Sequence, residues 1–390
     1  MDSPATPLSM VRLKALDGLR GIAILQVLFF HWEIRDFPHR LLLLPIEAFI
    51  RTGWLGVDLF FVLSGFLITG ILCDTRDTAG YFRNFYARRA LRILPLYYVF
   101  LGLSFVLQPL FGGRVPSPGV QASFWLHLAN FLMAIKGWGA SPLFVAHFWS
   151  LAVEEQFYLV WPSVVRLVTR RTLLGVCGAF IAVALGLRAV LRLTPLPWYS
   201  GMLLTPARLD ALALGALVAV LLRSARSAPI VERLAGRVAW VSGVACVVVF
   251  TWRGSWNAED SVVATLGTLS FDIFAASIVA CAATAAPDLA LSRFLSWGWL
   301  RTVGRYSYGM YVIHMLVVRV VSDWGLSIAE LARKHPTGIA HLLNVGVNLG
   351  LTFGLAVLSY QLFEQRFLRL KTRFEPGPPL ARAEQRVRFH

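Results

Sequence analysis

Apolar residues fill ten stretches of the chain, each bounded by polar loops. A helix needs about 20 predominantly apolar residues to cross a hydrocarbon layer about 30 Å thick. By this criterion the expected spans lie near residues 16–32, 54–73, 93–111, 147–167, 173–193, 207–222, 236–253, 262–285, 306–322 and 341–363. The pattern therefore predicts an all-α fold, a polytopic membrane bundle of about ten helices.

Other segments of the chain do not fit this pattern. Residues 124–135 are apolar but too short to span, so we expect a re-entrant or interfacial segment there. Residues 1–15 are expected to form an N-terminal tail without a cleavable signal pattern, residues 16–370 one membrane domain, and residues 371–390 a basic, disordered tail.

Composition and charge agree with a membrane protein. Of 390 residues, 57% are hydrophobic and 15% are charged, and the mean hydropathy is +0.64. The net charge of +16 does not indicate nucleic-acid binding, because Lys and Arg concentrate in both tails and in alternate loops. The positive-inside rule places these loops and both termini in the cytoplasm. The four cysteines lie in or beside apolar segments and predict neither a disulfide framework nor a metal site.

The first predicted span carries an arginine and a histidine, which a lipid-facing helix would not favour. Arg20 and His31 are eleven residues apart, within about 20° of three helical turns, so both side chains share one face. They lie about 16 Å apart along the axis, roughly half the hydrocarbon thickness. Either this face has a function, or Arg20 snorkels to a headgroup and His31 ends the helix.

Arginines gather at the cytoplasmic ends of three predicted helices. Besides Arg20, the group comprises Arg88, Arg89 and Arg92 in RRALR and Arg305 in GRYSYGMYVIH. Guanidinium groups bind phosphate oxygens in bidentate geometry, so several at one mouth suit a polyanionic cosubstrate. The alternative is ordinary charge that fixes topology, and for Arg88 and Arg89 the two interpretations weigh equally.

A second polar group is expected within the first turns from the outer face. It comprises His31, Asp58, Glu154, Glu155, Arg208 and Asp210. Adjacent carboxylates on a helix point about 100° apart, so at least one of Glu154 and Glu155 must face the bundle interior. Their expected partners are Arg208 and His31. The group is a candidate for catalysis and acceptor binding, with a structural ion pair as the alternative.

Trp149 lies near this second group, and a further polar strip on the ninth predicted span lies deeper. Trp149 is positioned to stack on a sugar, although an interfacial aromatic belt is the commoner reason for such a residue. Tyr308, Tyr311 and His314 follow at three-residue intervals and form a polar strip that hydrogen-bonds the interior or lines a path. We expect Tyr308 to belong to a structural network.

Six motifs occur in one order along the chain: LDGLRGIAILQVLFFH, WLGVDLFFVLSGFLIT, FYARRALRILPLYY, HFWSLAVEEQFYLVWP, RLDALALGALVA and GRYSYGMYVIH. Together they resemble acyltransferase family 3, the integral-membrane O-acyltransferases that modify bacterial O-antigen, exopolysaccharides, nodulation factors and some macrolides. The resemblance extends from about Lys14 to Leu370. In it, Arg20 and His31 occupy the family's Arg-x10-His positions.

The resemblance implies transfer of an acyl group, usually acetyl, from cytoplasmic acyl-CoA to a sugar hydroxyl of an envelope or exported glycan, in the bacterial cytoplasmic (inner) membrane. Acyl-CoA is then a cosubstrate, and no bound cofactor or metal is expected. Some family members carry a fused extracytoplasmic hydrolase-like domain. We find none in this sequence, so we expect the chain to complete transfer alone or with a separate partner.

The roles follow from depth and chemistry. His31 is the expected general base or acyl-carrying nucleophile, with Glu154 or Glu155 fixing its tautomer or binding the acceptor. The arginine group is expected to bind the donor. The acceptor is assigned to Asp58, Trp149, Arg208, Asp210, Tyr311 and His314.

Other functions are weighed against this one. The acceptor could be a secondary metabolite such as a macrolide sugar. A proton-coupled transporter would also place His and Glu in the membrane, but it should show paired broken helices, which the sequence lacks. A membrane scaffold would need neither polar group.

Overall fold

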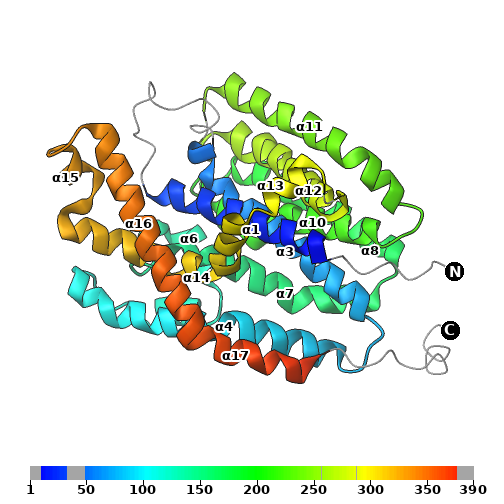
Figure 1. Ribbon diagram of the computed structural model, residues 1–390, viewed down its shortest axis with the longest axis horizontal. Helices are drawn as coiled ribbons and strands as arrows, with labels where there is room; N and C mark the ends of the chain where they lie inside the picture. Colours follow the sequence, from blue (N-terminus) through cyan, green and yellow to red (C-terminus); the bar gives the residue numbers. More distant parts are fainter. Residues whose placement is uncertain (1–9, 33–48, 256, 287, 376–390) are drawn as a thin grey trace.

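The computed structural model describes residues 10–32, 49–255, 257–286 and 288–375 (Figure 1). Within these ranges the elements are helices, and no strand is present. The long ones are α1 (Met10–His31), α3 (Gly56–Thr75), α4 (Tyr81–Leu107), α7 (Trp149–Leu167), α8 (Arg170–Leu191), α10 (Leu209–Leu222), α11 (Ala228–Arg253), α12 (Thr268–Thr284), α14 (Gly298–Val321) and α16 (Thr337–Ser359). Each overlaps one predicted span, so the all-helical prediction is confirmed.

Short helices connect these elements. They are α5 (Pro118–Trp125), α6 (Ala129–Lys136), α9 (Ser200–Leu203), α13 (Ala290–Leu295), α15 (Ile328–Ala332) and α17 (Gln365–Arg369). The apolar stretch 124–135 thus falls in α5 and α6, which join at His127, a residue with φ 55°. Each has 8 residues, about 12 Å, and neither crosses a membrane alone.

Eight helical segments in the described ranges are long and apolar enough to span a membrane. They contain α3, α4, α8, α10, α11, α12, α14 and α16, and they make this a multi-pass membrane protein. Helices α1 and α7 occupy the other two predicted spans but carry more charged side chains than a simple span admits. The count of ten therefore stays a prediction.

Helix α1 lies at the centre of the bundle, against α3, α12 and α14 (Figure 1). Glycine allows the helices to touch backbone to backbone, because a Cβ at Gly304 of α14 would overlap the carbonyl oxygen of Asp17 in α1. A Cβ at Gly65 of α3 would likewise overlap the carbonyl oxygen of Leu212 in α10. Small residues are the usual means by which membrane helices approach closely. These crossings fix the helices that carry the polar residues.

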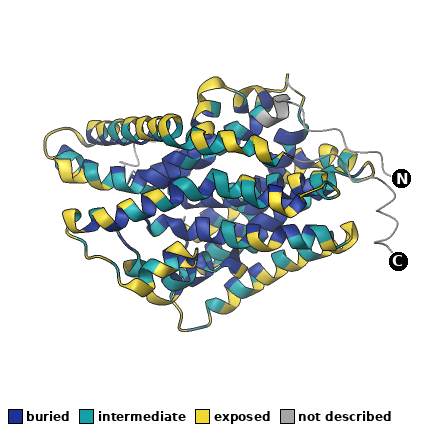
Figure 2. Ribbon diagram, turned by 90° about the horizontal axis from the view of Figure 1, so that it is seen from below, coloured by how far each residue is buried: buried dark blue, intermediate teal, exposed yellow. Residues whose placement is uncertain are grey.

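Burial decreases from this centre outward. Figure 2 shows dark-blue segments in the middle of the bundle, enclosed by helices whose outer faces are yellow. Peripheral α11 exposes Trp240, Val241, Val247 and Val248. An apolar surface of this kind on an outer helix is typical of lipid contact.

The described chain starts and ends at the same end of the bundle. Asn84, near the start of α4, donates a hydrogen bond to the carbonyl oxygen of Glu375 (3.1 Å). Lys371 lies within electrostatic range of Arg20 and Arg92. If both termini are cytoplasmic, as predicted, they must lie at the same end of the bundle, and they do. The side of the membrane that this end faces stays a prediction. Helical structure continues to Phe374, four residues into the predicted tail, and residues 376–390 lie outside the described ranges.

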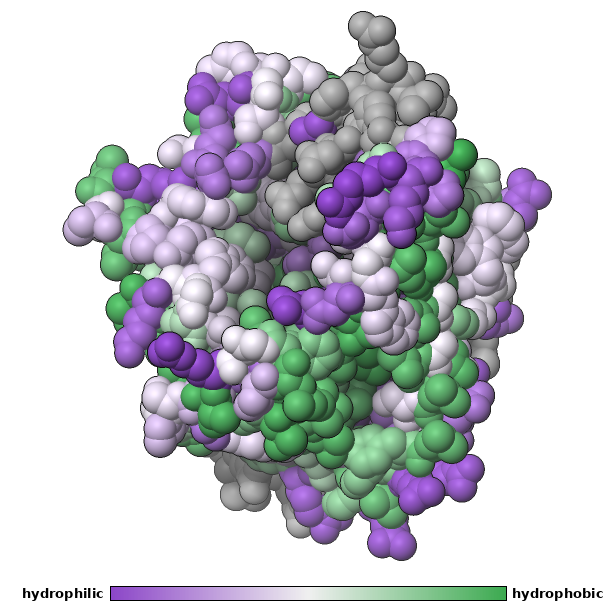
Figure 3. All heavy atoms as spheres, turned by 90° about the vertical axis from the view of Figure 1, so that its left-hand side faces the viewer, coloured by the Kyte–Doolittle hydropathy of each residue, from purple (hydrophilic) through white to green (hydrophobic). Residues whose placement is uncertain are grey.

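The opposite end of the bundle, near α15, faces the viewer in Figure 3. Hydrophilic side chains gather in the upper part of this view and hydrophobic ones below its centre, with further hydrophilic ones at the lower right and the bottom edge. A surface mixed in this way suits an end that emerges from the membrane beside lipid.

Cysteine labelling tests the predicted orientation. Ala79 and Ser117 are exposed residues in different loops. A cysteine at Ala79 is expected to react with an impermeant maleimide only after the membrane is opened, whereas one at Ser117 should react in intact cells, because the basic loops lie inside. The unsubstituted chain, with its four cysteines, measures the background. The reverse labelling pattern would overturn the orientation.

Candidate active site

Two adjoining cavities begin at the arginine-rich end of the bundle. The first, the vestibule, has a volume of about 570 Å³, and its walls include Asp17, Arg20, Arg92, Arg301, Arg305, Tyr308, Tyr360 and Glu364. The second, the chamber, has a volume of about 100 Å³, and its walls include Arg20, Ser64, Arg89, Arg92, Ser150, Glu154, Tyr158, Tyr308 and Tyr311. They share Arg20, Arg92 and Tyr308. A wide polar opening thus adjoins a narrow space inside the bundle.

The structure brings most of the predicted arginine group to these cavities. Arg20 pairs with Asp17 (3.2 Å), and Arg89 lies over the Tyr158 ring, with its Cζ 4.5 Å from the ring centroid. Arg305 lies 5.3 Å from the Tyr360 ring centroid at the vestibule. These positions agree with the prediction of a converging cationic mouth.

Arg88 is the exception within that group. Its side chain is exposed and forms no part of the wall of either cavity, although it stands one residue before Arg89. Adjacent residues on a helix point about 100° apart, so only part of the RRALR run can face one site. Arg301, one turn before Arg305, was not singled out from the sequence but lines the vestibule.

Glu154 belongs to the chamber rather than to an outer group. It accepts a hydrogen bond from Ser64 of α3, and it lies within electrostatic range of Arg89 and Arg20. Its predicted pairing with Arg208 or His31 is therefore wrong. The spacing of residues in the sequence gives the depth of a side chain along its own helix, but not how neighbouring helices are tilted against it. Glu154 lies more than one turn after the start of α7, where Ser64 of α3 approaches it. Glu155 lines neither cavity, although it too lies within electrostatic range of Arg89, as well as of Tyr308. Adjacent residues on a helix point about 100° apart, which accounts for the difference from Glu154.

Three histidine rings form a row beyond the chamber. The ring centroids of His31 and His314 are 5.0 Å apart, and those of His314 and His147 are 4.5 Å apart. The sequence placed His31 in the outer group and His314 in a deeper polar strip, but gave His147 no role. A single histidine in an apolar segment has no periodic partner, so only its presence in HFWSLAVEE could have drawn attention to it. Among the described residues, no cluster of His, Cys, Asp or Glu is arranged to hold a metal ion.

Backbone carbonyls define the tautomers of two of these rings. His31 Nδ1 lies 2.9 Å from the carbonyl oxygen of Val27, and His314 Nδ1 lies 2.7 Å from that of Tyr311. A carbonyl can only accept, so in each neutral ring Nδ1 donates and the lone pair is on Nε2. The carbonyl of its own helix thus fixes the His31 tautomer, a role that the sequence assigned to a glutamate.

Tyr311 links the chamber to the histidine row. Its hydroxyl lies 2.5 Å from Ser150 Oγ and donates to the carbonyl oxygen of His147 (2.8 Å). Its ring centroid is 5.0 Å from that of His147 and 5.7 Å from that of His314. Neighbouring Tyr308 donates to the carbonyl oxygen of Ile93 (2.7 Å), the structural bond expected of it.

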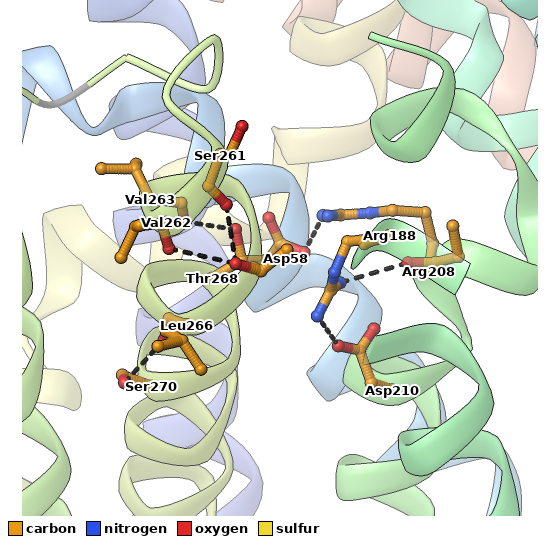
Figure 4. A network of polar contacts seen from close by, with 12 residues as sticks. Asp58, Arg188, Arg208, Asp210, Ser261, Val262, Val263, Leu266, Thr268 and Ser270 are labelled. Carbon is orange, nitrogen blue, oxygen red and sulfur yellow. Dashed lines mark hydrogen bonds and ion pairs between the residues drawn. The ribbon is translucent and has the colours of Figure 1, made fainter. Parts of the chain in front are cut away.

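The other predicted acceptor residues form a buried ion-pair cluster (Figure 4). Arg208 pairs with Asp58, and Asp210 pairs with Arg188 of α8, which the sequence did not single out. All four are at most 2% exposed. Asp272 of α12 lies within electrostatic range of Arg208 and Asp210. Each arginine is paired with a carboxylate away from water, which favours the structural alternative for Asp58, Arg208 and Asp210.

Trp149 is also part of the core. It is 3% exposed, and its ring lies edge-on to Phe61 with centroids 6.3 Å apart. A ring enclosed in this way presents no face for a sugar to stack on. The indole therefore packs α7 against α3.

Fold and site together define a helical membrane protein with a cationic cavity that leads toward buried histidines. A family model described as an acyltransferase domain matches residues 13–361. The chain therefore belongs to acyltransferase family 3, and the resemblance of its motifs is confirmed.

Named relatives carry the same domain within longer chains. The peptidoglycan O-acetyltransferase OatA of Listeria monocytogenes is 25% identical over 371 residues, which cover 90% of this chain and 55% of that protein. The O-acetyltransferase OatA of Staphylococcus aureus is 27% identical over 331 residues, 80% of this chain and 51% of that protein. The chain thus spans about half the length of these relatives. No solved structure matches it.

Proposed function

We propose that the protein is a membrane O-acyltransferase that moves an acyl group, most simply acetyl, from acyl-CoA to a sugar hydroxyl of an envelope or exported glycan. The observation that carries the proposal is the path from the arginines of the vestibule and chamber to Tyr311 and the histidine row. Family membership and the names of the relatives support the reaction class and a glycan acceptor.

The donor fits this path by charge and by length. Coenzyme A carries phosphates at one end and a thioester at the end of a long flexible arm. Phosphates at Arg20, Arg89 and Arg92 would be bound by charge-assisted hydrogen bonds. The arm would then follow the chamber toward Tyr311 and Ser150. Arg20 and His31 are about 16 Å apart on α1, so one helix spans most of the donor.

His31 is the proposed general base. With Nδ1 donating to Val27, Nε2 can take the proton of the acceptor hydroxyl, and the resulting alkoxide attacks the thioester carbonyl. A route through an acyl-His31 intermediate uses the same nitrogen. Glu154, inside the chamber, is suited to position the donor arm or its arginines rather than the imidazole.

The acceptor is proposed to arrive from the outer face of the bacterial cytoplasmic membrane, while the donor enters from the cytoplasm. The basic loops and the arginine-rich vestibule support this arrangement, because both lie at the end that the positive-inside rule places in the cytoplasm. His31, near the other end of α1, would then stand between the two compartments. A transporter would have no need for a cationic cavity that ends at a general base.

Arginine variants test the donor site. Arg92→Ala is expected to raise the KM for acetyl-CoA about 10-fold or more with a smaller change in kcat, because a phosphate contact remote from the thioester contributes mostly uniform binding. Arg20→Lys should be intermediate between Arg20→Ala and the parent, since a point charge replaces a fork. Kinetics of CoA release in proteoliposomes, with calorimetric binding of CoA, measure both.

Arg88→Ala is the matched control, because Arg88 is on the same helix and outside both cavities. It should keep the parent KM. If Arg92→Ala and Arg20→Ala bind CoA as tightly as the parent protein does, the proposal that these arginines form the donor site is wrong.

A further inference from the structure

Two hydroxyl groups meet at the inner end of the chamber. Ser150, the second residue of α7, and Tyr311 of α14 both line it, and their oxygens lie 2.5 Å apart. Both hydroxyls also approach one acceptor, the carbonyl oxygen of His147, at 3.2 Å from Ser150 and 2.8 Å from Tyr311. Both residues are buried, at 4% and 6% exposure.

The two hydroxyls have fewer protons than contacts. Two hydroxyl protons serve three contacts, so at any moment one contact has no proton between its oxygens. The Tyr311 bond is the shorter of the two to His147 and satisfies that carbonyl alone. When the Ser150 proton turns to an oxygen in the chamber, Tyr311 must share its own proton between the His147 carbonyl and Ser150 Oγ, because two hydroxyl oxygens 2.5 Å apart need a proton between them.

We propose that the Ser150 hydroxyl stabilises the oxyanion of the tetrahedral intermediate in acyl transfer, and that Tyr311 positions it. This inference rests on the proposed function. Ser150 also lies in the first turn of α7, where the positive end of the helix dipole favours negative charge. Tyr311 is a positioning residue, because it occupies the His147 carbonyl for which Ser150 would otherwise compete.

The reaction balances with these groups alone. The acceptor oxygen forms a bond to the thioester carbon while its proton passes to His31 Nε2, and the carbonyl π pair becomes the oxyanion that Ser150 binds. The oxyanion then re-forms the C=O bond and breaks the C–S bond. The departing thiolate takes the proton from His31, leaving an acyl ester, free CoA and a neutral imidazole.

Single and double variants test this assignment. Ser150→Ala is expected to lower kcat about 10² to 10³-fold, the usual effect of removing one oxyanion donor, with little change in the KM for acetyl-CoA. Tyr311→Phe should lose less, about 10-fold. The double variant should be no slower than Ser150→Ala, because Tyr311 acts through Ser150. Ser150→Thr, which keeps a hydroxyl, should recover most of the lost rate.

A transition-state analogue separates catalysis from folding. The methylphosphonothioate of CoA carries an anionic oxygen on a tetrahedral phosphorus, and Ser150→Ala should weaken its binding at least 10-fold while binding of CoA is unchanged. Ser242→Ala and Tyr81→Phe are matched controls, since each removes a buried hydroxyl that donates to a carbonyl away from both cavities. Both should keep parent activity.

The outcomes are distinct. Parent-like kcat in Ser150→Ala, or multiplicative losses in the double variant, would overturn the oxyanion assignment and leave the proposed function intact. A parent protein that neither binds CoA nor releases it from acetyl-CoA would overturn the proposed function and this inference with it.

Discussion

Replacing His31 with alanine is expected to reduce acyl transfer by about 10² to 10⁴-fold, the usual contribution of a general base, and more if the ring also carries the acyl group. The protein should still fold and insert, because His31 is the last residue of α1 and the apolar contacts of that helix remain. Transfer from radiolabelled acetyl-CoA to glycan in membrane vesicles measures the effect.

His335, an exposed residue near α15, supplies the control. The His335→Ala variant should transfer the acyl group at the rate of the parent protein. Acid-quenched samples of the parent protein, digested and examined by mass spectrometry, would reveal an acyl group on His31 if the reaction passes through it. Near-normal product from a well-inserted His31→Ala variant would contradict the catalytic role.

Replacing Arg208 with alanine is expected to destabilise the protein by about 3–5 kcal/mol, because it leaves the carboxylate of Asp58 buried without its partner. The change should appear as a large drop in the melting temperature in detergent and as poor accumulation in membranes. Replacing both partners together, Asp58→Leu with Arg208→Met, should restore part of the loss, since the carboxylate of Asp58 is then absent, while Asp272 still lacks the charge of Arg208.

Arg223→Ala is the matched control, because it breaks an ion pair at the surface instead of a buried one. Arg223 Nε binds Asp74 at 2.6 Å, but the Asp74 side chain is 57% exposed, and such pairs contribute about 0–1 kcal/mol. If Arg208→Ala melts like Arg223→Ala yet loses transfer, Arg208 serves the acceptor, as the sequence first suggested, and not the core.

The sequence predicts features that lie within one helix, but it does not predict which residues meet between helices. The positions of the ten long helices follow from apolar runs, and the shared face of Arg20 and His31 follows from helical periodicity. The partners of Glu154 and Arg208 come from residues 90 and 150 positions away, and no periodicity specifies them. The roles of His147 and Arg188 could not be predicted either, because the residues that they contact lie on other helices and no pattern in their own apolar segments marks them.

The central position of α1 has a consequence for biosynthesis. Its polar face is incompatible with lipid, and the helix that covers much of it, α14, begins almost 300 residues later in the chain. Arg20 must therefore stay near headgroups or the translocation machinery while the intervening helices are made. Residues of α14 line both the vestibule and the chamber, so a nascent chain that stalls before residue 298 can form neither cavity.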